Sequence, residues 1–175
     1  MNKGLVSGLV LLTIGLVCGI LLSVVNSFTA PRIKLEEDKI KYQALEEFYT
    51  LADYDISEYE ANGAFATIYI LKEKGQSDIS ALVYTVSAQG FAGPVQMLIA
   101  VNNDLSVEDY KVVSHTETSG YGADIVGNNF GVSEIDDLAG FDAVSGVTKT
   151  SNAIKECFNL VAQRINSDLG GGLSE

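Results

Sequence analysis

An uncharged run of 22 residues near the N-terminus, Gly4–Val25, limits the folds open to this chain. As an α-helix it would rise 1.5 Å per residue and cover roughly 30 Å, the thickness of the hydrocarbon core of a bilayer. A cleavable signal peptide is the alternative, but its apolar region is shorter and ends in small residues. Here Phe28 stands two residues before the nearest candidate site at Ala30, which makes a poor cleavage site. We therefore predict a retained transmembrane anchor over residues 1–30.

The chain beyond this run is strongly acidic. It holds all 23 Asp and Glu residues but 10 of the 11 Lys and Arg residues, which leaves a formal net charge of −13. Nucleic-acid binding requires a basic surface that neutralises phosphates, so we expect no nucleic-acid partner. Lys3 precedes the run, whereas Arg32 and Lys34 follow it. This nearly even balance does not decide which side of the membrane holds the soluble part.

The inventory of reactive side chains excludes several chemistries. His115 is the one histidine, and Cys157 is the one thiol outside the predicted span, which contains Cys18. A zinc cluster of His and Cys ligands and a disulfide framework are therefore out of reach. The chain has no Gly-x-Ser-x-Gly elbow, phosphate-binding P-loop or dinucleotide fingerprint. A metal or hydrolase site made of carboxylates alone stays open, because spacing does not select a pair.

Hydrophobic periodicity predicts an α+β fold in which helices flank an antiparallel sheet. Apolar residues at three- to five-residue steps predict a helix over Leu35–Leu51, and a second pattern predicts one over Ile154–Ile165 that begins near Ser151. Runs rich in β-branched and aromatic residues predict four strands, at Phe65–Leu71, Ile79–Ala88, Val95–Val101 and Asp109–Ser114. We expect residues 169–175 to form a flexible tail.

A loop rich in hydroxyl groups leads directly into the second predicted helix. Its sequence is Ser145-Gly146-Val147-Thr148-Lys149-Thr150-Ser151. The free N–H groups and positive dipole at the start of a helix suit a phosphate. A nearby hydroxyl could bind that phosphate or be esterified by it. The alternative is that these residues serve only as helix N-caps and turn formers.

A second glycine-rich loop, residues 114–124, directly follows the last predicted strand. Gly120 and Gly122 would let the backbone approach a flat ligand, while Glu117 and Thr118 supply hydrogen bonds. The alternative is an ordinary loop whose glycines adopt positive φ, with His115 at the strand end.

Three motifs, in the same order, resemble the bacterial FMN-binding domain family, especially the G subunit of the ion-pumping Rnf complex and the related C subunit of the Nqr complex. The motifs are Gly90-Phe91-Ala92-Gly93-Pro94-Val95, His115-Thr116-Glu117-Thr118-Ser119-Gly120-Tyr121-Gly122 and Phe141-Asp142-Ala143-Val144-Ser145-Gly146-Val147-Thr148-Lys149-Thr150. The resemblance implies an FMN-binding domain over residues 31–168. It also implies that FMN is joined through its phosphate to Thr148, with Thr150 the neighbouring alternative.

The resemblance implies further cofactor contacts and partners. The expected contacts are Asp142, Ser145, Gly146, Glu117, Thr118, Gly120 and Gly122. A separate flavin transferase would attach FMN taken from FAD. The protein would be an electron-transfer subunit of an ion-translocating ferredoxin:NAD oxidoreductase, with other membrane redox subunits as partners and its soluble domain outside the cytoplasm. Val147 departs from the family's usual alanine. Two alternatives remain: a membrane-tethered binding module without cofactor, and the FMN component of a stand-alone extracellular electron-transfer system.

Overall fold

The computed structural model describes residues 3–119, 122–125, 127–141 and 143–172. Its first element, α1 (Lys3–Phe48), is one continuous helix that is long and apolar enough to cross a membrane. Residues 35–48 are helical, as predicted for Leu35–Leu51, but they belong to α1, which runs through Pro31 and ends at Phe48. A proline removes one N–H donor, and the turns on either side can keep the helix going. The chain divides into two compact units, Met1–Lys39 and Ile40–Glu175.

The second unit is built around a five-stranded antiparallel sheet whose strands lie side by side in sequence order. The strands are β1 (Tyr54–Glu60), β2 (Phe65–Glu73), β3 (Ala81–Gln89), β4 (Pro94–Asn102) and β5 (Val107–His115). All four predicted strands are confirmed. Sequence analysis missed β1, which pairs only with β2 at one edge of the sheet.

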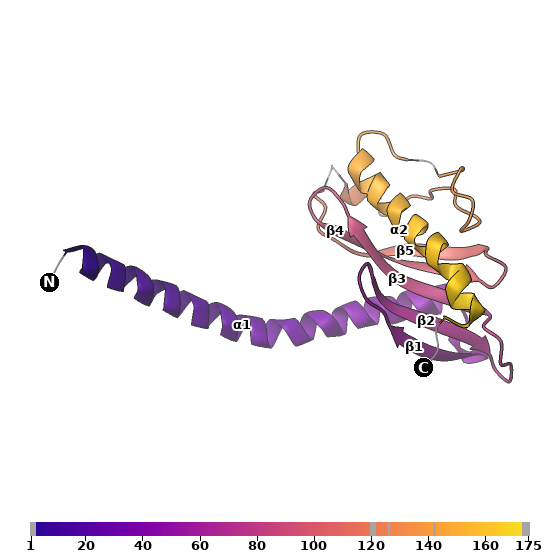
Figure 1. The fold of residues 1–175 in the computed structure, drawn as a ribbon, viewed down its shortest axis with the longest axis horizontal. Coiled ribbons are helices and arrows are strands. Elements are labelled where there is room, and N and C mark those ends of the chain that lie inside the picture. Colours follow the sequence, from indigo (N-terminus) through magenta and orange to yellow (C-terminus); the bar gives the residue numbers. More distant parts are fainter. Residues whose placement is uncertain (1–2, 120–121, 126, 142, 173–175) are drawn as a thin grey trace. The chain divides into compact units, whose positions relative to one another are not determined.

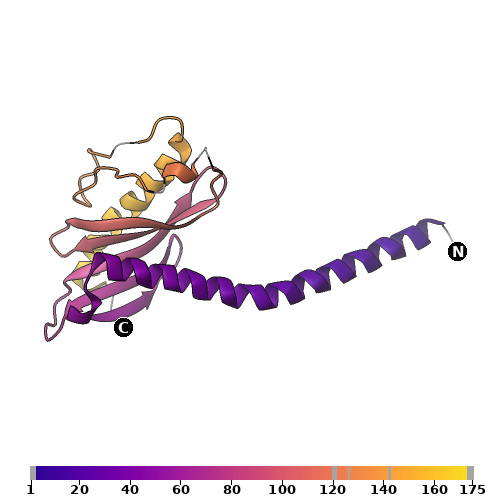
Figure 2. The same ribbon diagram turned by 180° about the vertical axis from the view of Figure 1, so that it is seen from behind.

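Helices cover both faces of this sheet, which confirms the predicted fold class. On one face lies α2 (Thr148–Ser167), whose buried apolar side chains belong to the same cluster as Tyr84 and Met97. On the other face, Leu45 near the end of α1 joins a cluster with Val83 and Leu98. Figures 1 and 2 show α2 and the last turns of α1 on opposite sides of the sheet. Strands β3 and β4 are consequently buried along most of their length.

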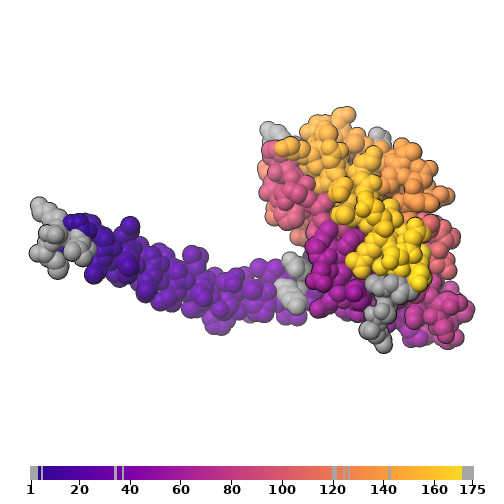
Figure 3. Space-filling model, in the orientation of Figure 1, coloured from indigo at the N-terminus to yellow at the C-terminus, as the bar shows by residue number. Residues whose placement is uncertain are grey.

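The segment that joins β5 to α2, residues 116–147, is mostly irregular. Within its described part the longest helical piece is the short turn Ala123–Ile125. Phe130 and Ile135 nevertheless lie in the apolar cluster beneath α2. Figure 3 shows this segment, in orange, on the surface beside α2. It brings the predicted site residues next to the start of that helix.

Helix α2 begins earlier, and helical structure continues further, than the sequence pattern indicates. The helix starts at Thr148, three residues before Ser151. Beyond its end, Asp168–Gly172 forms a π-helical turn. Residues 173–175 of the predicted tail lie outside the described residues.

Candidate flavin site

The hydroxyl-rich loop forms the first turn of α2. Val147 occupies the N-cap position, and no side chain caps the helix. The Ser151 hydroxyl instead accepts a hydrogen bond of 3.2 Å from the N–H of Val144 in the preceding loop. Gly146 has φ of +89°, a conformation that favours glycine, and so turns the chain into the helix. The Ser and Thr side chains here therefore do not act as the N-cap, and the positive end of α2 remains available to an anion.

The two candidate attachment residues have opposite surroundings. The Thr148 side chain is exposed, whereas Thr150 is 2% exposed. Successive helical residues are rotated by about 100°, so two residues separated by one other lie on nearly opposite faces. The buried Thr150 hydroxyl has no hydrogen-bond partner. The Thr148 side chain is therefore accessible from solvent, whereas the Thr150 hydroxyl is not.

A hollow of about 290 Å³ lies at this first turn. It is lined by Phe91, Gly146, Val147, Thr148, Lys149 and Thr150. Phe91 comes from the turn between β3 and β4, and the Lys149 ammonium lies 5.5 Å from the centroid of its ring. Two of the three sequence motifs thus meet here. We assigned no role to Phe91 or Lys149 from the sequence, although both lie inside those motifs.

The remaining motif, residues 115–122, reaches the same place through Glu117. This side chain is 8% exposed, and its Oε1 accepts hydrogen bonds from the N–H groups of Phe91 (2.7 Å) and Ala92 (3.3 Å). A Cβ at Gly122 would stand 2.8 Å from Glu117 Oε2 and 2.9 Å from Thr150 Oγ1. Glycine at position 122 therefore lets the loop that carries Glu117 pack against the first turn of α2 and the turn at Phe91. Glu117 binds the protein's own backbone, a role that the sequence motif did not reveal.

The remaining predicted contacts divide into two groups. Thr118 and Ser145 are exposed, and the Thr118 carbonyl accepts a hydrogen bond of 3.4 Å from Ala123. Asp142 and Gly120 lie outside the described residues.

His115 pairs with Val95 at the end of β5, and its buried Nδ1 has no hydrogen-bond partner. Across the described part of the chain, no group of three or more His, Cys, Asp or Glu side chains could hold a metal ion.

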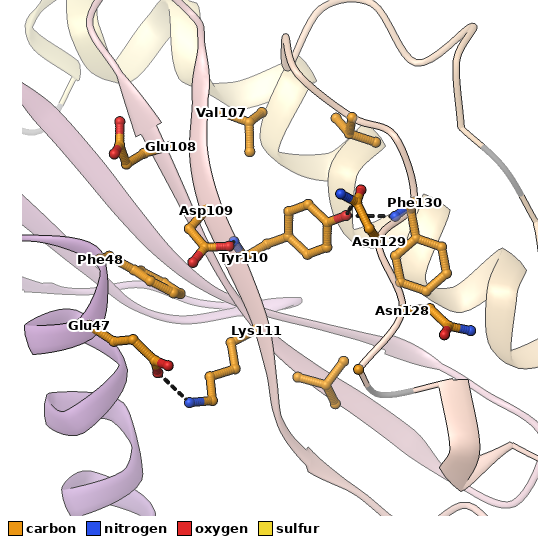
Figure 4. Close-up of a pocket in the computed structure, with 13 residues that line it drawn as sticks. Glu47, Phe48, Val107, Glu108, Asp109, Tyr110, Lys111, Asn128, Asn129 and Phe130 are labelled. Carbon is orange, nitrogen blue, oxygen red and sulfur yellow. Dashed lines mark hydrogen bonds and ion pairs between the residues drawn. The ribbon is translucent and has the colours of Figure 1, made fainter.

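A larger cavity of about 510 Å³ lies elsewhere, between β5, the end of α1 and residues 127–132. Figure 4 shows Tyr110 reaching from β5 toward the loop, where its hydroxyl accepts a hydrogen bond of 2.6 Å from Phe130 N–H. Lys111 forms an ion pair with Glu47 across the cavity. None of the predicted flavin contacts lines this cavity.

Comparison with known proteins shows which family the segment around this hollow resembles. Residues 90–163 match the FMN-binding domain family, and this segment contains all three motifs. The resemblance to this family is confirmed. A curated relative is the G subunit of the proton-translocating ferredoxin:NAD(+) oxidoreductase complex of Clostridium ljungdahlii, which is 28% identical over 112 residues. The alignment covers 57% of this chain and 60% of the relative. The match over residues 90–163 supports FMN as the cofactor.

The described residues around this hollow fit a phosphate-bearing ligand. The start of α2 has no side-chain cap, and the buried Thr150 hydroxyl has no partner. Buried polar groups are ordinarily hydrogen-bonded, so an unpartnered one beside a hollow indicates a place for a ligand atom. The Lys149 ammonium adds a positive charge next to Thr148. These groups suit one end of a flavin nucleotide.

Proposed function

We propose that this protein is a membrane-anchored electron carrier whose FMN is joined through its phosphate to Thr148. The observation that carries this proposal is the contrast between the two threonines. Thr148 is exposed on the first turn of α2 and lines the hollow, whereas the Thr150 hydroxyl is buried. The match of residues 90–163 to the FMN-binding domain supports the identity of the cofactor.

The attachment is an exchange of phosphate bonds in which Thr148 supplies the nucleophile. A flavin transferase acts as the second protein and FAD as the donor. The Thr148 hydroxyl oxygen forms a bond to the FMN phosphorus while the pyrophosphate bond of FAD breaks. AMP leaves, and the hydroxyl proton passes to a base or to solvent. The positive end of α2 and the Lys149 ammonium then stabilise the negative charge of the phosphodiester.

The bound FMN supplies reversible uptake and release of electrons, and the protein's part is to hold it and shield it. The Clostridium ljungdahlii relative belongs to a proton-translocating ferredoxin:NAD(+) oxidoreductase complex. We therefore assign this protein to a complex of the Rnf type, with membrane redox subunits as electron donor and acceptor. A tag on the full chain in its native host should recover those subunits from solubilised membranes. Recovery of the flavoprotein without any redox subunit would favour a stand-alone carrier.

The mass of the intact full-length protein tests the attachment. Expression with a flavin transferase should add the mass of FMN less one water, and Thr148→Ala should remove that addition. Thr148→Ser keeps a hydroxyl and should retain part of it. Thr150→Val removes the alternative hydroxyl and leaves Thr148 intact, so it should still reach the same final mass. An unchanged mass addition in Thr148→Ala would refute the attachment site.

Cysteine labelling in intact cells tests the proposed position of the domain outside the cytoplasm. Asp136 is exposed, so Asp136→Cys places a thiol on the surface of the domain. Cys157 is buried and should not react with the label, and Cys18→Ser removes the other thiol. A maleimide that does not cross membranes should label this variant without permeabilisation. Labelling only after permeabilisation would place the domain in the cytoplasm.

A further inference from the structure

Phe91 is a large apolar side chain that the protein leaves open to solvent. It is 63% exposed. Among the described residues from Ile40 onward, the other exposed large hydrophobic residues are Ile40 and Tyr42, which belong to α1 and are less exposed. Phe91 instead projects from a turn between two strands and lines the hollow beside Thr148. An exposed aromatic ring next to a binding hollow indicates a contact surface rather than a core residue.

The turn that carries Phe91 is built around a buried carboxylate. Glu117 accepts the N–H groups of Phe91 and Ala92, and Gly90 N–H donates to Gly93 O at 2.8 Å. A Cβ on Gly90 would stand 2.1 Å from Glu117 Oε1, so the carboxylate fills the space that a side chain would need. Burying a charged group is unfavourable unless hydrogen bonds compensate, and here the compensation fixes the turn. The backbone that carries the exposed ring is therefore fixed.

The ring also has a defined chemical environment. The Lys149 ammonium lies 5.5 Å from its centroid, within the range of a cation–π interaction. Phe91, Thr148 and Lys149 line one hollow, so a group attached to the threonine would have the ring beside it. Aromatic faces bind other planar ring systems by stacking.

We propose that Phe91 is the surface on which the planar ring system of the Thr148-tethered cofactor stacks, and that Glu117 is the positioning residue that holds it. The inference rests on the proposed function and adds to it the residue that contacts the ring. The ligand chemistry it requires is a flat, electron-poor heteroaromatic ring at the end of a phosphate-linked chain. Glu117 does not itself contact the cofactor in this proposal.

Fluorescence of the loaded full-length protein tests the stacking. Tryptophan in contact with an excited flavin ring quenches its emission by electron transfer, whereas phenylalanine does not. Phe91→Trp should therefore lower flavin emission several-fold at equal covalent loading, measured by intact mass. Tyr42→Trp, an exposed aromatic position whose ring contacts Tyr69 in the cluster on the other face of the sheet, is the control and should leave emission unchanged.

The two proposals fail in different ways. Full loading with undiminished emission in Phe91→Trp would overturn the stacking and leave the attachment standing. No added mass in the wild-type protein would overturn the attachment, and the stacking with it.

The positioning role of Glu117 is tested in the Phe91→Trp protein. Glu117→Ala removes both backbone contacts and should restore much of the lost flavin emission. Glu117→Gln keeps one carbonyl acceptor of the same length and should retain most of the quenching. Far-UV circular dichroism and intact mass check that each variant is folded and loaded, and Glu117→Gln keeps the test decisive if the alanine variant does not fold. Equal quenching in all folded variants would overturn the positioning role.

Discussion

The two ends of α2 are built differently although they belong to one helix. At the C-terminal end, Asp168 is 3% exposed, and its Oδ2 accepts hydrogen bonds from the Tyr84 hydroxyl (3.0 Å) and Arg164 Nε (2.8 Å). At the N-terminal end, Val147 provides no side-chain cap, and the Thr150 hydroxyl is buried without a partner. The buried carboxylate at the C-terminal end is therefore hydrogen-bonded within the protein, whereas the buried Thr150 hydroxyl at the N-terminal end is not.

This difference indicates that the C-terminal end of α2 serves stability and the N-terminal end serves binding. A satisfied buried network holds one conformation and contributes to stability. Unsatisfied buried groups are unfavourable, and the Thr150 hydroxyl lies beside the hollow, where a ligand atom could become its partner. The C-terminal end fixes α2 to β3, and the N-terminal end is the part available to a ligand. Changes at the two ends should therefore affect different properties.

The largest expected effect is on the reactivity of Cys157, in the middle of α2, where the helix packs against the sheet. Burial raises the pKa of the Cys157 thiol to about 12, with a smaller contribution from the charge of Glu156. Only the thiolate reacts with iodoacetamide, so at pH 8 the native thiol should react at least about a hundredfold more slowly than the unfolded one. Mass spectrometry of a Cys18→Ser protein, with and without guanidinium, measures this ratio. Similar rates in both states would mean that α2 leaves the sheet readily.

Next in size is the loss of Asp168. Asp168→Ala removes the shared acceptor of a buried tyrosine and an arginine, and it should lower the free energy of unfolding by about 2–3 kcal/mol. Urea unfolding of the full chain in detergent, followed by near-UV circular dichroism, gives the value. The exposed Asp136→Ala should change it by less than about 0.5 kcal/mol. Equal small effects would remove the distinction between the two ends.

Much of this fold could be predicted from the sequence because its central strands are buried. The apolar run in β4 and the β-branched residues of β2 and β3 leave a clear pattern. Strand β1 leaves none, since Asp55, Glu58 and Glu60 interrupt it and its outer edge is free. Pairing with β2, rather than its own pattern, makes this segment a strand.

The site could be predicted only as far as its segments. The resemblance placed contacts from residues 117–122 and 142–150 at one site, and the described parts do meet around Gly122. It assigned no contact to the first motif, residues 90–95, although Phe91 lines the same hollow. Which threonine is exposed depends on where α2 begins, because each residue of shift turns the helix by about 100°. Because the sequence pattern placed the start of α2 near Ser151 and not at Thr148, it did not give the directions of the Thr148 and Thr150 side chains. The inward role of Glu117 depends on tertiary packing and has no local signal.

The third prediction concerns the unpartnered hydroxyl at the N-terminal end. Thr150→Val keeps the shape and removes the buried polar atom, so it should leave the flavin-free protein as stable or more stable by up to about 1 kcal/mol. If the hydroxyl serves the cofactor, the same change should slow covalent loading in a time course of intact mass. Thr50→Val, at an exposed threonine outside the three motifs, controls for the change in side-chain chemistry. Destabilisation by Thr150→Val would show that the hydroxyl already has a partner within the protein.

The smallest expected effect comes from giving this end the cap that it lacks. Val147→Thr keeps the branched shape and adds an oxygen that can accept an N–H of the first turn, so it should stabilise the flavin-free protein by about 0.5 kcal/mol. In the flavin-loaded protein the phosphate competes for the same N–H groups, and the gain should shrink. Urea unfolding of Val147→Thr with and without loading measures both values, and Thr148→Ala supplies a protein that remains unloaded under both conditions. An equal gain with and without flavin would mean that the phosphate does not lie at the start of α2.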